Sequence, residues 1–160
     1  MNPRWWLIPL TLLIALMLTM VPLPRAGEAF RPEWVTLVAL YWAFALPQRF
    51  GLTLGWCVGL LLDVAQGALL GQNALAIVLV VAFARRVHQR LRVAPVAQQA
   101  VIVTGLLFVK QALVLWTSGL AGRAPTAPWL YFAAPLSALI LWPVLFVVLR
   151  DLRRRYQAAH

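Results

Sequence analysis

Long apolar runs, separated by short segments containing proline, glycine and arginine, dominate this sequence. A helix needs about 20 mostly apolar residues to cross the hydrocarbon core of a bilayer, and several runs approach that length. Proline and glycine between the runs interrupt helices. The pattern predicts an all-α, polytopic membrane protein that forms a single integral membrane domain over residues 1–160, with spans near 5–23, 32–46, 51–66, 73–88, 98–120 and 129–149.

The stretch from Gly51 to Ala84 is the ambiguous part of this pattern, because it is slightly shorter than two ordinary spans. The positive-inside rule places Arg4, the basic cluster at 85–92 and the basic tail at 150–155 in the cytoplasm. An even number of crossings must then separate Arg4 from the cluster, and two runs already lie between Arg4 and Gly51. The stretch therefore crosses twice, with a turn within 66–73, which predicts six spans with both termini cytoplasmic.

The first apolar run also has to be compared with a signal peptide, because Arg4 precedes it. The run is long for the apolar region of a signal peptide, which spans about 7 to 15 residues. The triplet Gly27-Glu28-Ala29 is a poor cleavage site. We expect an uncleaved first span.

Composition and charge favour a membrane protein over a nucleic-acid-binding one. Hydrophobic residues make up 63% of the chain and charged residues 11%, with a formal net charge of +10. The basic residues lie at the ends of apolar runs, whereas a nucleic-acid footprint would be a patch on a soluble domain. The predicted basic cytoplasmic surface either meets anionic lipid or an acidic partner, or serves only to fix topology; it comprises Arg85, Arg86, Arg90, Arg92, Arg150, Arg153, Arg154 and Arg155.

Residues able to support catalysis are scarce in this chain. It has four acidic residues, two histidines and one cysteine, and no pair of them falls at a motif spacing. The glycine-rich stretch has neither a GxxxxGK[ST] pattern nor a preceding strand. We therefore predict no enzymatic activity and no catalytic, cofactor-binding or metal-binding residue. Cys57 has no cysteine partner, so no disulfide forms within the chain.

Four glycines and one aspartate recur at four-residue intervals: Gly55, Gly59, Asp63, Gly67 and Gly71. Residues four apart share a helix face, and glycine there lets another backbone approach closely. Each four-residue step drifts by about 40° around a helix, so one neighbour cannot contact all five. We expect the first three to form one seam, which packs within the chain or against a partner's helix, and the last two to serve the turn.

Asp63 and Lys110 lie at a similar depth in their predicted spans. A charge inside a membrane is costly, and an acid and a base at one depth can relieve each other's desolvation. A possible intramembrane ion pair between them is one hypothesis. Asp63 held neutral or bonded to backbone near the turn, a contact to a partner helix, and a proton or ion relay are the alternatives.

Several short motifs occur in order along three quarters of the chain. They are Phe30-Arg31-Pro32-x-Trp34, Tyr41-Trp42-x-x-Ala45-Leu46-Pro47, Gly59-x-x-x-Asp63-x-x-x-Gly67-x-x-Leu70-Gly71-x-x-Ala74-Leu75, Gln98-Gln99-Ala100 and Leu141-Trp142-Pro143. With these motifs, its length and its basic tail, the sequence resembles the rod shape-determining protein MreD family. The first span matches only in hydrophobicity, and Lys110 lies outside the family pattern.

The resemblance implies a non-enzymatic scaffold or regulatory subunit of the bacterial cell-elongation (rod) complex, in the inner membrane. It implies MreC as the most direct partner. MreB filaments, the glycosyltransferase RodA and a class B penicillin-binding protein belong to the same complex, and membrane lipid surrounds it. The family's six-helix topology is similar to that of the substrate-binding subunits of energy-coupling-factor transporters. The alternative function is therefore a small-molecule or lipid-binding component of a transporter.

Overall fold

The computed structural model describes residues 6–21, 34–45, 50–67, 70–122 and 132–158. These residues form helices and turns and contain no strand. The helices are α1 (Leu7–Met20), α3 (Trp34–Ala45), α4 (Leu52–Gln66), α5 (Gln72–Arg92), α6 (Val96–Leu120) and α7 (Ala133–Ala158). The prediction of an all-helical chain with six helices is confirmed for this part of the sequence.

The helices overlap the six predicted spans, but α5 and α7 continue beyond them. The predicted span boundaries at 5, 23, 32, 46 and 129 lie outside the described residues. Helix α5 runs on through the basic cluster to Arg92, and α7 runs on through the basic tail to Ala158. Arginine is a good helix former, so a helix does not end where its apolar run ends. That all six helices cross a membrane remains a prediction.

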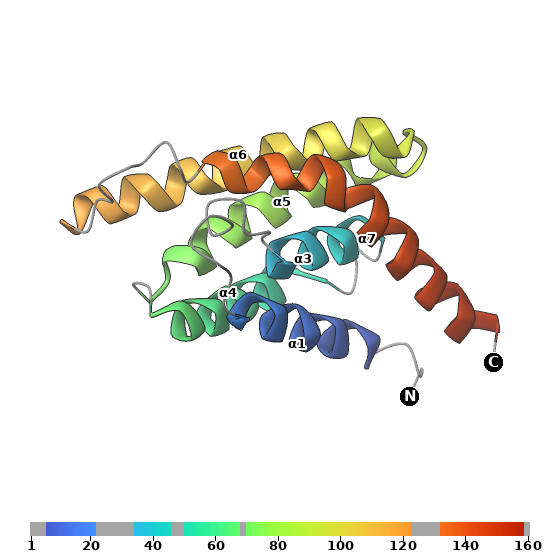
Figure 1. Ribbon diagram of the computed structural model, residues 1–160, viewed down its shortest axis with the longest axis horizontal. Coiled ribbons are helices and arrows are strands. Elements are labelled where there is room, and N and C mark those ends of the chain that lie inside the picture. The colour runs from blue at the N-terminus through green and yellow to red at the C-terminus, as the bar shows by residue number, and fades with distance from the viewer. Residues whose placement is uncertain (1–5, 22–33, 46–49, 68–69, 123–131, 159–160) are drawn as a thin grey trace.

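The helices run back and forth along the long axis of the molecule (Figure 1). The start of α1, the end of α7 and the turn between α5 and α6 lie at one end of the bundle. The turn between α4 and α5 lies at the opposite end. We call these the terminal end and the α4–α5 end.

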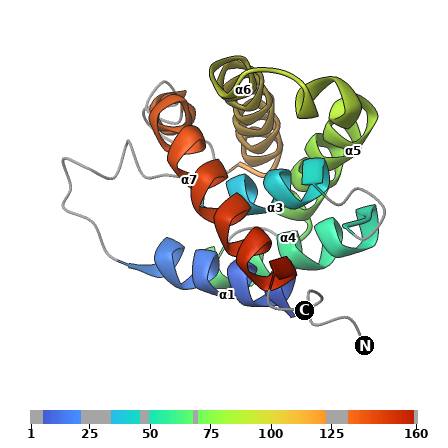
Figure 2. The same cartoon turned by 90° about the vertical axis from the view of Figure 1, so that its right-hand side faces the viewer.

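Helix α3 is the centre of the bundle (Figure 2). Every residue from Val35 to Phe44 is buried, so all sides of this short helix are covered. It packs against α1, α4, α5 and α7. An apolar helix without a polar face suits this central position, because a helix that is hydrophobic all round has to be buried or in contact with lipid.

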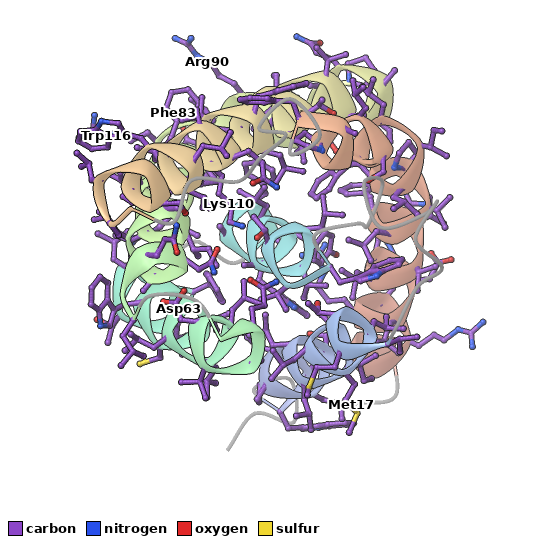
Figure 3. The ribbon with its side chains drawn as sticks, turned by 60° about the vertical axis from the view of Figure 1, so that its left-hand side comes forward. Met17, Asp63, Phe83, Arg90, Lys110 and Trp116 are labelled. Carbon is purple, nitrogen blue, oxygen red and sulfur yellow. The ribbon has the colours of Figure 1, made fainter. Side chains whose placement is uncertain are left out.

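Apolar residues cover much of the exterior of the bundle, and several polar residues are buried in its otherwise apolar interior. The buried polar side chains are Thr11, Thr19, Thr36, Asp63, Asn73, Gln99, Thr104, Lys110 and Gln111. Large apolar side chains of α1, α4, α5, α6 and α7 are exposed, among them Met17, Phe83 and Trp116 (Figure 3). Exposed apolar surface of this extent is unusual for a water-soluble bundle, and lipid is the surrounding that fits it.

Two of the helices are long and apolar enough to cross a membrane by themselves. They are α6 (Val96–Leu120) and the part of α7 from Pro135 to Arg155. Helices α1, α3 and α4 are apolar but shorter. Short apolar helices fit a bilayer when neighbours shield their ends, and α3 has neighbours along its whole length.

Aromatic side chains join α3 to α7 at the terminal end. The Tyr41 and Phe146 ring centroids lie 5.8 Å apart and those of Phe44 and Trp142 lie 5.9 Å apart, both edge to face. Helix α7 contains Pro143, which removes a backbone hydrogen bond, and the helix bends so that its later part crosses the terminal end of the bundle (Figures 1 and 2). The bend brings the basic tail over the end of α3.

Candidate functional site: the seam between α4 and α5

Helix α4 approaches the backbone of α5 closely at Gly59. A Cβ atom added to Gly59 would lie 2.2 Å from the Cα atom and 2.7 Å from the backbone nitrogen of Ala74. Such separations are far below van der Waals contact, and the neighbouring atoms are backbone, which cannot rotate away. Glycine is therefore required here by the distance between the helices.

Gly55 lies on the same seam one turn earlier, but it is not under the same constraint. A Cβ atom there would meet methyl groups of Val81 and Ile77 at 3.7 and 3.8 Å, which is ordinary contact. The two helices diverge toward the terminal end. The two helices thus leave no room for a side chain at Gly59, whereas at Gly55 they leave room for alanine.

Gly67 and Gly71 shape the turn that joins the two helices. Gly67 ends α4 with φ of 66°, and Gly71 precedes α5 with φ of 94°. Both values are in the left-handed region, which residues with a side chain adopt at an energetic cost. These two positions therefore serve backbone conformation, whereas Gly59 serves close packing.

The Asp63 carboxylate binds the start of α5. Asp63 has no exposed surface, and its Oδ2 and Oδ1 atoms accept hydrogen bonds from the backbone N–H groups of Gly71 and Asn73, both at 2.9 Å. The first backbone N–H groups of a helix lack partners within the helix, and its N-terminus favours negative charge. Asp63 thus caps α5 from the preceding helix, while its own carbonyl accepts the N–H of Gly67.

Two amide side chains at the start of α5 extend this polar region. The Asn73 amide donates to Oε1 of Gln66 at 3.2 Å, which closes the turn. The Gln72 amide nitrogen lies within 3.0 Å of three acceptors on α6: the carbonyl of Val114 and the hydroxyls of Thr117 and Ser118. Its two hydrogens are shared among these acceptors, and they tie the α4–α5 end to α6.

Lys110 lies in the middle of α6 and is buried, next to the buried Gln111. Figure 3 shows Lys110 and Asp63 on the interior sides of their helices. The hydrogen bonds described above give the Asp63 carboxylate two backbone donors, which is the backbone-bonded arrangement considered from the sequence. The ion pair between Asp63 and Lys110 remains a prediction.

The predicted basic surface divides into outward-facing and inward-facing arginines. Four are exposed: Arg86, Arg90, Arg154 and Arg155. Arg90 points away from the bundle (Figure 3). Three are half-buried: Arg85, Arg150 and Arg153. The side chain of Arg92 lies outside the described residues.

Gln99 is a buried junction that reasoning from the sequence did not single out as a site residue. Its amide nitrogen donates to the Leu91 and Ala94 carbonyls, and its Oε1 accepts from the Trp142 indole at 3.4 Å. Gln99 thereby links α7 to the turn that connects α5 with α6. The available signal was a polar amide inside an apolar span, within the motif Gln98-Gln99-Ala100.

The chemistry of the seam is that of packing and capping. Among the described residues, no group of three histidine, cysteine, aspartate or glutamate side chains lies close enough to hold a metal ion. The Asp63 carboxylate is occupied by backbone N–H groups. The seam therefore supplies a rigid pair of helices, and what it can do is hold α4 and α5 in one fixed arrangement.

Comparison with known proteins assigns the family. The family model described as "rod shape-determining protein MreD" matches residues 2–152. The chain is 25% identical over 152 residues to the Rod shape-determining protein MreD of Haemophilus influenzae, covering 95% of this chain and 93% of that protein. No solved structure matches. Because the match extends over nearly the whole chain, this protein belongs to the MreD family of rod shape-determining proteins.

Proposed function

We propose that this chain is a non-enzymatic, multi-pass subunit of the inner-membrane complex that elongates rod-shaped bacteria. Membership of the MreD family supports a role in determining rod shape. The observation that carries the proposal is the exterior of the bundle, where exposed apolar side chains cover the outer helices while polar groups are buried. Such a protein acts through helix faces and short loops.

In this proposal the chain crosses the membrane six times with both termini in the cytoplasm. Two features support that orientation. The start of α1 and the end of α7 lie at the same end of the bundle. The exposed Arg86 and Arg90 of α5 and Arg154 and Arg155 of α7 are also on helix segments near that end, and basic residues favour the cytoplasmic side.

The proposed partners meet different parts of this surface. The single membrane helix of MreC packs on an exposed apolar helix face, and α1 offers one because it carries a row of exposed apolar residues. MreB filaments approach the basic terminal end from the cytoplasm. RodA and its class B penicillin-binding protein complete the complex, so that the chain works as a scaffold or regulator between filament and wall synthesis.

A transporter component is the second candidate function. The buried polar side chains of Asp63, Asn73, Lys110 and Gln111 favour it, since a binding subunit needs polar groups inside its bundle. In this alternative the six helices form a fold like that of the energy-coupling-factor substrate-binding subunits. The backbone bonds of Asp63 weigh against it, because they give one of these groups a structural role.

Replacement of the resident MreD in a rod-shaped bacterium tests the proposal. We expect cells that express only this chain to stay rod-shaped, and we expect MreC and wall synthases to co-purify with it in mild detergent. An inactive control is a strain with an empty vector, which should become round. Round cells in which the chain is stably inserted, or co-purification of an ATPase-coupled transporter module instead, would contradict the proposal.

A further inference from the structure

Three buried hydrogen-bond donors without an acceptor lie where α7 crosses the end of α3. The Tyr41 hydroxyl belongs to a residue that is 1% exposed, and the Nε atoms of Arg150 and Arg153 are also buried. Within the described part of the chain, none of these three atoms has a hydrogen-bond partner. Buried polar groups in native proteins are nearly always hydrogen-bonded, so this concentration requires an explanation.

The helical register directs both arginines toward Tyr41. Phe146, Arg150 and Arg153 are spaced by four and three residues, which places them on one face of α7. Phe146 identifies that face, since its ring packs on Tyr41, and the Arg150 Cζ atom lies 5.7 Å from the Phe146 ring centroid.

The neighbouring arginines provide an internal comparison. Arg154 and Arg155 belong to the same basic tail but are exposed, whereas Arg150 and Arg153 are half-buried. The Asp151 carboxylate is the nearby acid, and its Oδ1 atom lies 3.9 Å from Arg150 Nε, too far for a hydrogen bond. Tyr41, Arg150 and Arg153 therefore form an inward-facing group of hydrogen-bond donors, and its two positive charges exceed the one negative charge of Asp151.

The group that would complete this cluster is an anion with several acceptor oxygens. Guanidinium groups bind phosphate through paired, charge-assisted hydrogen bonds, and a phenol can donate a further one. The exterior of α7 just before the basic tail is apolar: Val144, Val147 and Val148 are exposed, and their register places them on the side of the helix away from Phe146. A ligand whose phosphate reaches the arginines from the membrane surface, and whose hydrocarbon chain lies in the surrounding apolar layer, has the chemistry of a phospholipid.

We infer that Arg150 and Arg153, above Phe146 and Tyr41, form a site for the phosphate group of an anionic phospholipid. The site lies where the apolar exterior of α7 gives way to its basic tail, which is the depth of lipid phosphates. The inference rests on the chain being embedded in a membrane and not on the identity of its protein partners. Bound lipid would hold the bent end of α7 against α3.

Lipid-dependent thermal stability of the purified full-length protein tests this site. Phosphatidylglycerol, phosphatidylcholine and inorganic phosphate are each titrated into protein in neutral detergent, and Tm is followed by circular dichroism. We expect phosphatidylglycerol alone to raise Tm. The inward double variant Arg150→Gln/Arg153→Gln should raise the half-saturating lipid concentration about tenfold or more, and Tyr41→Phe should raise it by less.

The outward double variant Arg154→Gln/Arg155→Gln removes the same charge and is the matched control. It should keep the wild-type lipid response. An equal loss in both double variants would mean that only net charge matters, and the inference would be overturned. An equal response to inorganic phosphate, or a response to a poly-glutamate peptide instead of lipid, would overturn it too. If the inward double variant does not fold, the lipid response of Tyr41→Phe is compared with that of the outward double variant instead. A weaker response in Tyr41→Phe alone supports the site, and equal responses overturn it.

Discussion

Replacing Gly59 with alanine places a methyl group where α5 leaves no room for it. The new Cβ atom would lie 2.2 Å from the Ala74 Cα atom, whereas ordinary contacts begin at 3.4 Å. To restore ordinary contact, the seam between α4 and α5 must therefore open by about 1.2 Å, the difference between these two distances. The displaced group is backbone, so rotation of a side chain cannot relieve the contact.

The matched change, Gly55→Ala, separates this effect from the general effect of alanine in a helix. Alanine favours a helix over glycine by about 1 kcal/mol at either position, so this gain cancels when the two variants are compared. The remaining difference is the cost of overpacking at Gly59, about 1–3 kcal/mol. For a chain of this size that corresponds to roughly 2–4 °C in Tm per kcal/mol.

Thermal unfolding of the two purified variants in one detergent, followed by circular dichroism, measures this difference. We expect Gly55→Ala to match or exceed the wild-type Tm and Gly59→Ala to fall clearly below it. Equal Tm values for the two variants would show that Gly59 is not constrained by Ala74, because the distance to Ala74 is what distinguishes the two positions. A larger residue, as in Gly59→Leu, should also disrupt assembly with partners and the rod shape of cells.

The remaining predictions concern buried polar groups, and all use the same unfolding assay. Asp63→Ala removes two bonds to backbone N–H groups, each worth about 1.5–3 kcal/mol, and should lower stability strongly; a Tm near wild type would show that the cap contributes little. If Asp63 and Lys110 pair, Asp63→Asn and Lys110→Met should each be more damaging than the double replacement, and additive effects would exclude a direct pair. Gln99→Leu leaves the Leu91 carbonyl and the Trp142 indole without this partner and should cost about 1–3 kcal/mol; an unchanged Tm would contradict that role.

The sequence predicts the helices well because their signal is local. Long apolar runs with proline and glycine between them mark where each helix lies. The ends of α5 and α7 were not predicted, because hydropathy shows where an apolar run ends and does not show where helical hydrogen bonding ends. The central place of α3 could not be predicted either. Its sequence is apolar all round, so no periodicity indicates which neighbours cover it.

Spacing also could not distinguish residues that share a pattern. Gly55 and Gly59 are equivalent in sequence, and only the distance between α4 and α5 makes Gly59 the constrained one. Asp63 has a depth that sequence indicates, but its direction toward the N-terminus of α5 depends on the geometry of the turn. Likewise, four arginines in one tail look alike, and the register of α7 on α3 separates Arg150 and Arg153 from the other two.

The paired crossing of α4 and α5, on which the six-span topology depends, is tested most directly by thiol labelling at the two ends of α5. Leu70, in the turn before it, is 75% exposed, and Val93, just after it, is 86% exposed. Each is changed to cysteine in a background with Cys57→Ser, and intact cells, with the outer membrane permeabilised where one is present, are treated with a membrane-impermeant maleimide. We expect Leu70→Cys to react at once and Val93→Cys to react only after the inner membrane is opened. Equal reactivity of the two probes in these cells, or the reverse order, would contradict it.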